Sequence, residues 1–324
     1  MLANIERAVS SYSMLEGLER GGAVTVALSG GADSVSLLHA LKRLCTGLGL
    51  VVKACHLNHK LRGEESERDE RFVRHLCEEY NVPLTVKSSD VAALKQKHQS
   101  IEEIARNERY SFFDEAVLIS GGKIATAHTA DDNAETVLFN LVRGSALKGL
   151  CGIPPVRGNI IRPLIFCGRA EVEQYCRENN LEYVTDSTNL LDEYTRNRIR
   201  NNIIPLLRGI NPAVLDAVNR MTDELRRDEE FIAGFAAETL SKANENDKYS
   251  AEILNTVPSP VLNRIIAIIL SQNNISPSKL LIYGIRDILA DGRGKINIKK
   301  DVFAIVKKGF FYLERQKQSY RKKD

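Results

Sequence analysis

Short apolar segments alternate with longer segments of helical pattern through the first half of the sequence, and this alternation restricts the fold more than any other feature. The segments typical of β-strands are Ala23–Leu28, Val51–Leu57, Leu84–Val86 and Lys123–Ala127. A helical pattern follows each of them, the last three at about Glu64–Tyr80, Ile101–Val117 and Asp131–Val142. Strands that alternate with helices of about 10 to 15 residues indicate β-α-β units and a parallel sheet with both faces buried. Since crossovers between parallel strands are right-handed, we predict a doubly wound α/β domain.

The alternation ends near Gly209–Pro212. From Ala213 to about Ala243 the sequence predicts one long helix, followed by shorter helices at Pro260–Ser271 and Pro277–Leu289. Residues 295–313 contain two or three short strand candidates. We therefore predict an α/β domain over residues 1–209 and a smaller, mostly helical domain over residues 210–324.

The composition is typical of a globular protein, with 43% apolar and 27% charged residues among 324. No apolar run approaches the roughly 18 residues of a membrane helix, and the N-terminus lacks the apolar region of a secretory signal. The six cysteines form no C-x-x-C pair and no zinc-type spacing, so we expect reduced, mostly buried thiols in a cytoplasmic protein. The sequence leaves the oligomeric state open, a homodimer included.

Positive charge is concentrated at the C-terminal end. Residues 293–324 hold 11 Lys or Arg against 3 acids, although the net charge of the whole chain is only +3. A basic end on a near-neutral body favours a polyanionic partner, nucleic acid first of all. A solvated tail that aids solubility explains the same charge equally well.

The most informative segment is Ser29-Gly30-Gly31-Ala32-Asp33-Ser34, which joins the first strand to the first helix. Two glycines let the chain turn tightly and let the backbone approach a polyanion, and the N–H groups of a new helix attract phosphate. Asp33 would repel phosphate directly, so we expect it to hold a Mg²⁺ ion that bridges phosphates. A simple helix cap is the alternative. The segment lacks the G-K-[ST] of a Walker loop and the G-x-G-x-x-G of a dinucleotide site.

Further polar residues follow the later strands. His128 ends the fourth strand, and Asp132 and Glu135 share a helix face on which two carboxylates can grip an ammonium group, bind Mg²⁺ or act as a base. Acids that merely stabilise the helix dipole are the alternative. Candidates in other segments are Arg106, on one helix face with Arg109, and Asn189 and Arg200 in polar segments that suit phosphate or RNA contacts.

These segments resemble known enzymes. SGGADS is similar to the loop of the N-type ATP pyrophosphatases, and the ordered set closely resembles the tRNA(Ile)-lysidine synthase family from Ser29 to about Leu206. The set comprises SGGADS, HLNHKLRGEESERDERF, SIEEIARNERY, AHTADDNAETVLFNLVRGSALKGLCGIP, RPL and DSTNLLDEYTRNRIRNNIIP. Residues 210–324 are less specific, although a helical domain with a basic end is similar to the tRNA-binding region of that family.

The resemblance implies an ATP-dependent ligase that joins free L-lysine to carbon 2 of the wobble cytidine in the isoleucine tRNA with anticodon CAU. The cytosine oxygen attacks the α-phosphate of ATP, pyrophosphate leaves, and the amine of lysine then displaces AMP, which changes codon reading from AUG to AUA. By resemblance, residues 29–34 with Mg²⁺ hold the departing pyrophosphate, Arg106 contacts the nucleotide phosphates, and His128 lies near the reacting phosphate. Asp132 and Glu135 orient lysine and take a proton from it, and Asn189 and Arg200 hold the cytidine and the adenylated intermediate.

Two other functions fit parts of the same pattern. A tRNA thiolation enzyme can share the adenylating loop, but that chemistry usually needs a thiol pair or an iron–sulfur cluster, and the chain has no C-x-x-C. A non-catalytic tRNA-binding protein could keep the loop as a nucleotide sensor. The presence of all the downstream polar residues argues against it.

Overall fold

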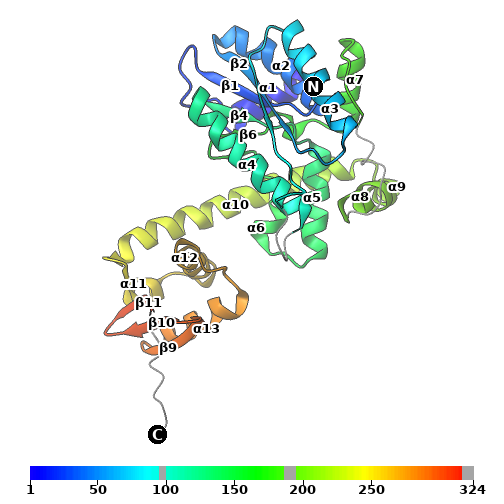
Figure 1. The fold of residues 1–324 in the computed structure, drawn as a ribbon. Helices are drawn as coiled ribbons and strands as arrows, with labels where there is room; N and C mark the ends of the chain where they lie inside the picture. Colours follow the sequence, from blue (N-terminus) through cyan, green and yellow to red (C-terminus); the bar gives the residue numbers. More distant parts are fainter. Residues whose placement is uncertain (95–99, 186–194, 316–324) are drawn as a thin grey trace. The chain divides into compact units, whose positions relative to one another are not determined.

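The computed structural model describes residues 1–94, 100–185 and 195–315. The chain forms two compact units, Met1–Asp223 and Glu224–Asp324 (Figure 1). Each unit has a hydrophobic core of its own.

The first unit is built on a six-stranded sheet with the order β3-β2-β1-β4-β6-β5. Its strands are β1 (Ala23–Ala27), β2 (Val51–Asn58), β3 (Leu84–Ser88), β4 (Lys123–Ala125), β5 (Val156–Arg157) and β6 (Ile160–Ile161). All neighbouring strands are parallel except β5, which pairs antiparallel with β6. The four predicted strands and the predicted parallel α/β sheet are confirmed. The chain moves outward from β1 to β3 and returns to β4 on the other side of β1, and ligands bind beyond the carboxyl ends of strands at such a reversal.

Helices connect these strands. They are α1 (Leu2–Ser11), α2 (Ala32–Leu48), α3 (Glu64–Glu79), α4 (Ile101–Ser120), α5 (Ala130–Val142), α6 (Leu147–Leu150) and α7 (Arg169–Glu178), with a 3-10 turn, η1 (Pro163–Phe166), before α7. The hydroxyl of Ser100 accepts the N–H of Glu103 and so caps α4. The apolar face of α2 packs on the sheet, since Leu37, Leu38 and Leu41 are fully buried in the same core as Val24.

A short, irregular helical segment leads out of the sheet. It comprises α8 (Thr195–Arg198), a π-helical turn η3 (Ile199–Ile203) and α9 (Ile204–Ile210), and it is followed by the long predicted helix α10 (Val214–Ala243). Pro205 near the start of α9 has no N–H to continue a regular helix, which fits the change in helical pitch before it. Turns of the π type are frequent at functional sites, and η3 carries Arg200.

The second unit combines helices with a five-stranded antiparallel sheet of order β7-β8-β11-β10-β9. Its helices are the end of α10, α11 (Ala251–Thr256), α12 (Ser259–Gln272) and α13 (Lys279–Ala290), and its strands are β7 (Asn244–Glu245), β8 (Lys248–Ser250), β9 (Gly294–Lys299), β10 (Val302–Lys307) and β11 (Phe310–Arg315). The predicted helices and the strand candidates of residues 295–313 are confirmed. The expectation of a mostly helical unit is confirmed only in part, because β7 and β8 extend those strands into an antiparallel sheet of five strands. β7 and β8, of two and three residues, are too short to show a period in the sequence.

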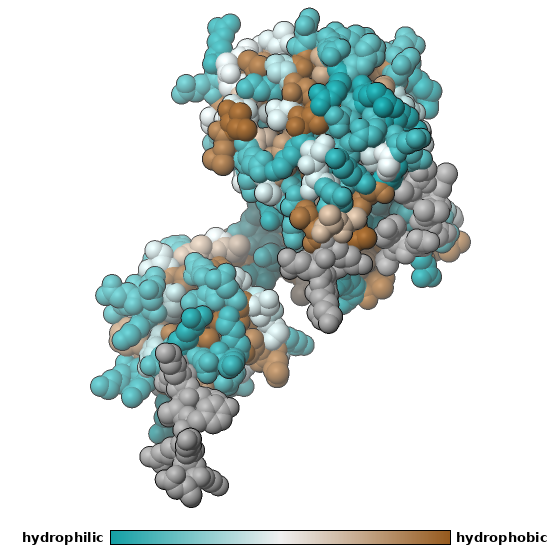
Figure 2. Space-filling view, in the orientation of Figure 1, coloured by the Kyte–Doolittle hydropathy of each residue, from teal (hydrophilic) through white to brown (hydrophobic). Residues whose placement is uncertain are grey.

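Apolar side chains fill the two cores, and hydrophilic side chains predominate on the face of the molecule in Figure 2. Over the part of the chain that the structure describes, no helix is long and apolar enough to cross a membrane.

Candidate active site

Ser34 holds the segment between β1 and α2 in a tight loop. Its hydroxyl oxygen accepts hydrogen bonds from the backbone N–H groups of Ser29 and Gly30, both at 3.2 Å, and donates to the carbonyl of Gly31 at 3.0 Å. It also lies 3.1 Å from the hydroxyl of Ser29. Since the single proton of Ser34 goes to Gly31, this side chain shapes the loop in the structure.

The two glycines of the loop have different surroundings. Gly30 has a φ of +93°, and a Cβ atom there would lie 2.9 Å from Cγ2 of Val184, whose N–H donates to the Gly30 carbonyl. Gly31 has a φ of −75°, and its Cβ atom would meet nothing closer than Ser29 Oγ at 3.7 Å. The fold therefore requires glycine at position 30, whereas a Cβ atom at position 31 would make only ordinary van der Waals contacts.

The loop ends at the N-terminus of α2. The N–H groups of Ala32 and Asp33 precede the first intrahelical hydrogen bonds, as in helix termini that bind anions. Burial and the nearby Asp132 carboxylate raise the pKa of Asp33 to about 6, although Arg169 and Arg200 oppose this shift. The interaction between Asp33 and Asp132 also shows that the loop and α5 meet at one edge of the sheet.

A pair of carboxylates lies on the first turns of α5. Glu135 is only 2% exposed, and Arg200 contacts it with both arms of its guanidinium, Nε to Oε1 at 2.6 Å and Nη2 to Oε2 at 2.9 Å. Arg200 Nη2 also donates to Asp132 Oδ1 at 3.3 Å. Burial raises the pKa of Glu135, and the hydrogen bond from Arg200 opposes the rise. Two predicted carboxylates and one predicted arginine thus come together, with the acids already neutralised.

Arg169, at the start of α7, is a member of this cluster that the sequence did not reveal. Its Nη2 atom lies 3.5 Å from Asp132 Oδ1 and 3.8 Å from Glu135 Oε1, and its backbone N–H donates to Asp131 Oδ2 at 2.8 Å. Asp131 also contacts Arg208 of α9 at 3.4 Å. The three acids of α5 therefore contact α7 and α9 through arginines, in addition to lying near the loop.

Thr129 fixes the direction of Asp132. The hydroxyl of Thr129 accepts the Asp132 N–H at 3.3 Å and donates to Asp132 Oδ2 at 3.0 Å, and the Thr129 N–H donates to the same oxygen at 2.9 Å. This reciprocal cap explains part of the acidic pattern of α5, as the simpler interpretation of the sequence expected. The remaining oxygen, Oδ1, faces the two arginines.

His128 lies at the carboxyl end of β4 in a strongly basic environment. Its Nδ1 atom is 3.0 Å from the hydroxyl of Thr126. Burial lowers the pKa of His128 to about 4, helped by three nearby arginines and opposed by Asp132; the arginines are Arg162, Arg109 and Arg196. The imidazole is therefore neutral at physiological pH and can accept or donate a hydrogen bond.

Arg106 lies on the exposed face of α4. Its guanidinium carbon is 5.3 Å from the ring centroid of Tyr110, and Arg157 of β5 approaches the same ring at 5.0 Å. Arg157 lies in the short β5–β6 hairpin and is not among the residues that the sequence predicted. Asn189 and the segment 186–188 lie outside the described residues.

Two further histidines, His56 and His59, lie at the end of β2 and just after it. His56 Nδ1 lies 2.8 Å from the Leu28 carbonyl, and burial lowers the pKa of this ring, so it links the ends of β2 and β1. Burial also lowers the pKa of His59, to about 4. Both rings are neutral at physiological pH.

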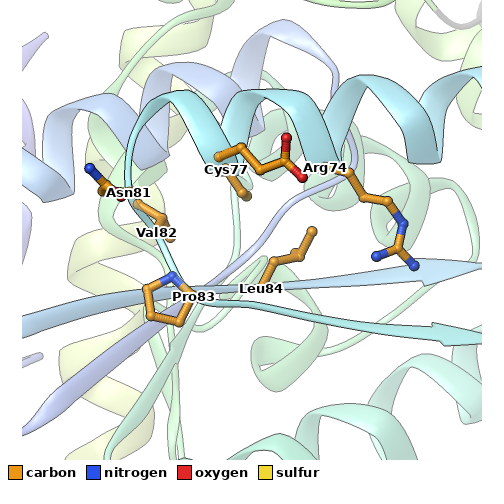
Figure 3. A pocket seen from close by; sticks show the side chains of 7 residues that line it. Arg74, Cys77, Asn81, Val82, Pro83 and Leu84 are labelled. Carbon is orange, nitrogen blue, oxygen red and sulfur yellow. The ribbon is translucent and has the colours of Figure 1, made fainter.

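The residues around Asp33 could bind Mg²⁺ only if the phosphates of a bound substrate supplied the remaining oxygen ligands. In residues 1–94, 100–185 and 195–315 no group of three or more His, Cys, Asp or Glu side chains is placed to hold a metal. Mg²⁺ commonly takes one or two carboxylates together with substrate phosphates, and the Asp132 carboxylate, which adds to burial in raising the pKa of Asp33, supplies negative charge that a cation would relieve. A cavity of about 380 Å³ lies elsewhere, between the end of α3 and the start of β3 (Figure 3). It is at the amino end of that strand and so lies away from the loop.

Comparison with known proteins agrees with this geometry. Residues 3–207 match the PP-loop domain family. The chain belongs to the PP-loop family. The match covers the whole sheet, the loop of residues 29–34 and Arg200.

Curated relatives of this PP-loop chain are named tRNA(Ile)-lysidine synthase, which confirms the resemblance seen in the motifs. The protein of Bacteroides thetaiotaomicron is 46% identical over 202 residues, which cover 62% of this chain and 46% of the relative. The protein of Clostridium perfringens is 38% identical over 299 residues, 89% of this chain and 64% of the relative. That of Thermotoga maritima is 44% identical over 234 residues, 72% and 55%. The chain thus spans less than two thirds of the length of these relatives.

A solved structure supports the fold. The U34-tRNA thiolase NcsA from Methanococcus maripaludis, determined with its 4Fe-4S cluster, superposes with a TM-score of 0.57 over 69% of this chain and 78% of its own. At 17% sequence identity, this likeness concerns the architecture alone.

Proposed function

We propose that this PP-loop protein is a tRNA(Ile)-lysidine synthase. It would use ATP to join free L-lysine to carbon 2 of the wobble cytidine in the isoleucine tRNA with anticodon CAU, releasing AMP and pyrophosphate. The observation that carries the proposal is the meeting of an anion-binding helix terminus with the buried Glu135, Asp132 and Arg200 at one sheet edge. Relatives of that name at 38–46% identity support it.

In the first step the loop would bind the phosphates of ATP. The missing side chain at Gly31 lets the phosphates approach the N–H groups of Ala32 and Asp33, which stabilise the negative charge of the departing pyrophosphate. When bound, Mg²⁺ supplies further positive charge there, and Asp33 would hold it. The fixed charge of Arg106 suits the developing charge of the α-phosphoryl group, and the neutral His128 can hydrogen-bond near it.

In the second step the acidic pair would bind lysine. Since Arg200 and Arg169 already neutralise Asp132 and Glu135, the lysine ammonium must take the place of a guanidinium on these oxygens. The released Arg200, together with Asn189, would then be available to the adenylated cytidine. Glu135, whose pKa burial raises, is the better base of the two for the proton that the ammonium must lose before attack.

We further propose that residues 1–209 are the catalytic domain and residues 210–324 a tRNA-binding domain. The 11 basic residues from Arg293 to Asp324 would contact the tRNA backbone. The reaction would take place in the cytoplasm, where thiols such as the six buried cysteines stay reduced.

The test uses purified protein with ATP, Mg²⁺, labelled lysine and two tRNA transcripts, isoleucine-type and elongator methionine-type, both with anticodon CAU. Label in the isoleucine tRNA alone, with AMP and pyrophosphate released, is the expected result. Formation of AMP that needs tRNA but incorporates no lysine would contradict the proposal and indicate another nucleophile. Tight tRNA binding without any turnover would favour a non-catalytic binding protein.

Thiolation is the second adenylating reaction to consider, because NcsA is a thiolase of the same fold. All six cysteines of this chain are buried, and burial raises the pKa of Cys45, Cys55, Cys77, Cys167 and Cys176 to about 11 or 12. Thiols of this kind are poor nucleophiles and poor cluster ligands. The observations therefore favour lysine as the nucleophile.

A further inference from the structure

The sheet of the second unit has one face that the core does not use. In an antiparallel sheet, paired residues lie on the same face, and the pairs Val306↔Phe311 and Phe311↔Tyr249 belong to the core side. These three side chains are 0–6% exposed. The alternate residues therefore point away from the core.

The outward face combines aromatic rings with lysines. Phe310 pairs with Lys307, and Tyr312 follows Phe310 on the same face, next to Lys248 of β8. The ammonium of Lys248 lies 5.5 Å from the centre of the Tyr312 ring. Both lysines are exposed, and both rings are half-buried.

These side chains enclose a hollow of about 520 Å³, which we call the lysine–aromatic hollow; it is lined by Lys248, Lys307, Lys308, Phe310 and Tyr312. A second lysine–aromatic pair lies on the same face, with Lys295 Nζ 3.9 Å from the centre of Phe303. Glu314, opposite Phe303, and Glu245, opposite Lys248, are acids on the same face. The hollow itself is lined by three positive charges and two rings.

We propose that the lysine–aromatic hollow binds an unpaired nucleotide of RNA. Phe310 or Tyr312 would stack on the base, and the three lysines would contact the flanking phosphates. Exposed sheet faces with aromatic rings recognise single-stranded RNA in this way, because splayed-out bases offer a flat face to the rings. The volume lies within the range of small-ligand sites, of about 300–1,000 Å³. Rings in this position favour a single strand over a duplex, whose bases are already stacked.

This inference rests on the proposed function only in expecting the RNA to be a tRNA. It also differs from the backbone contacts proposed for the basic residues of the C-terminal end, because it requires base stacking. A purely electrostatic site would bind any polyanion, and a stacking site would not.

The experiment measures binding of the full chain to a fluorescent single-stranded RNA of mixed sequence and to a hairpin duplex of equal length. The double variant F310L/Y312L removes the rings but keeps apolar volume, and we expect single-strand affinity to fall about tenfold with little change for the duplex. The variant K307Q/K308Q, at two exposed positions, should reduce the slope of log affinity against log salt by about 1.4, or 0.7 for each phosphate contact. Thermal melting verifies that the variants are folded.

The chain offers a matched control on α13. There Lys279 lies 5.5 Å from the Tyr283 ring, the same distance as in the Lys248–Tyr312 pair, but on a helix and not on a strand of the sheet. The double variant K279Q/Y283L should leave RNA binding unchanged.

Three results would overturn the inference: unchanged single-strand affinity in F310L/Y312L, an equal loss for the duplex, or full displacement of the RNA by polyglutamate of matched charge. The last result would indicate an acidic protein partner or a general anion site. Lysine incorporation is measured separately. Lysine incorporation can persist when the lysine–aromatic hollow does not bind single-stranded RNA, and single-strand binding can persist when lysine incorporation is absent, so the two failures can be distinguished.

Discussion

The phosphate loop and the acidic pair of α5 meet at one edge of the sheet, but the chain builds them in different ways. Ser29 and Ser34, five residues apart, hold the loop together, whereas Glu135 is bound by Arg200, 65 residues away. The loop presents helix N–H groups and a residue without a side chain, Gly31, to an anion. The acidic pair already contacts cations of the chain itself. A ligand can therefore enter the loop directly, but a cationic ligand must replace an arginine to reach the carboxylates.

The largest loss of stability should come from breaking the ion pair between Arg200 and Glu135, which joins distant segments of the chain. Arg200→Met leaves the buried Glu135 beside Asp132 without its bidentate partner, and we expect a loss of about 3 kcal/mol in the free energy of unfolding. The double variant E135Q/R200M should recover most of this stability without recovering lysine incorporation. Urea unfolding measures the first effect and labelled lysine the second.

The control for this experiment is Arg208→Met. Arg208 contacts Asp131 at 3.4 Å but its side chain is 51% exposed, so we expect a loss below about 1 kcal/mol. If Arg200→Met and Arg208→Met lost equal free energy of unfolding, the burial of Glu135 would not make its ion pair with Arg200 stronger than the exposed ion pair of Asp131 with Arg208.

The two glycines provide the next test, because the fold requires only one of them. Gly30→Ala combines a positive φ with a Cβ contact of 2.9 Å, and should cost about 2 kcal/mol in unfolding free energy. Gly31→Ala should change stability by less than about 1 kcal/mol but lower ATP affinity at least tenfold, because the new methyl group occupies space that phosphate needs. Calorimetry with ATP and thermal melting separate the two effects. Normal ATP affinity in Gly31→Ala would contradict the proposed phosphate site.

The same contrast explains what the sequence could predict. The four strands of the parallel sheet were predictable because each is a short, mostly apolar segment, and the loop was predictable because the hydrogen bonds of Ser34 that shape it are local. The hairpin strands β5 and β6, of two residues each, are too short to show a period. Arg169 gave no signal, because its contact with Asp132 exists only once α7 lies beside α5. In the second unit the strands β9–β11 were visible, but their joining with β7 and β8 into one sheet depends on tertiary pairing.

Asp33 should show a conflict between stability and function. Burial and Asp132 raise its pKa from 3.8 to about 6, so the folded state binds the proton more tightly than the unfolded state does. Stability contributed by this group is therefore lost as pH rises from about 4 to 6. Asp33→Asn avoids the loss, and at pH 7.5 it should be more stable than the wild type by on the order of 1 kcal/mol.

Binding of ATP with Mg²⁺ should change in the opposite direction. It should strengthen in the wild type as pH rises through about 6, because the ionised carboxylate favours the cation, and this rise should be absent in Asp33→Asn. Titrations at several pH values measure both trends. A D33N variant that keeps the wild-type pH profile would show that Asp33 does not hold the cation.

The smallest expected effect concerns the local part of the acidic pair. Thr129→Val keeps the shape of a fully buried side chain but removes the hydroxyl that accepts the Asp132 N–H and donates to Oδ2, which should cost about 1 kcal/mol. Since the Thr129 N–H still donates to Oδ2 at 2.9 Å, the carboxylate keeps one restraint, and KM for lysine should rise only a few-fold with little change in kcat. Thr129→Ser keeps the hydroxyl and should restore both values. A loss of kcat as large as that of Arg200→Met would show that the cap and the distant arginine act as one unit, and that the local and long-range parts of this site cannot be separated.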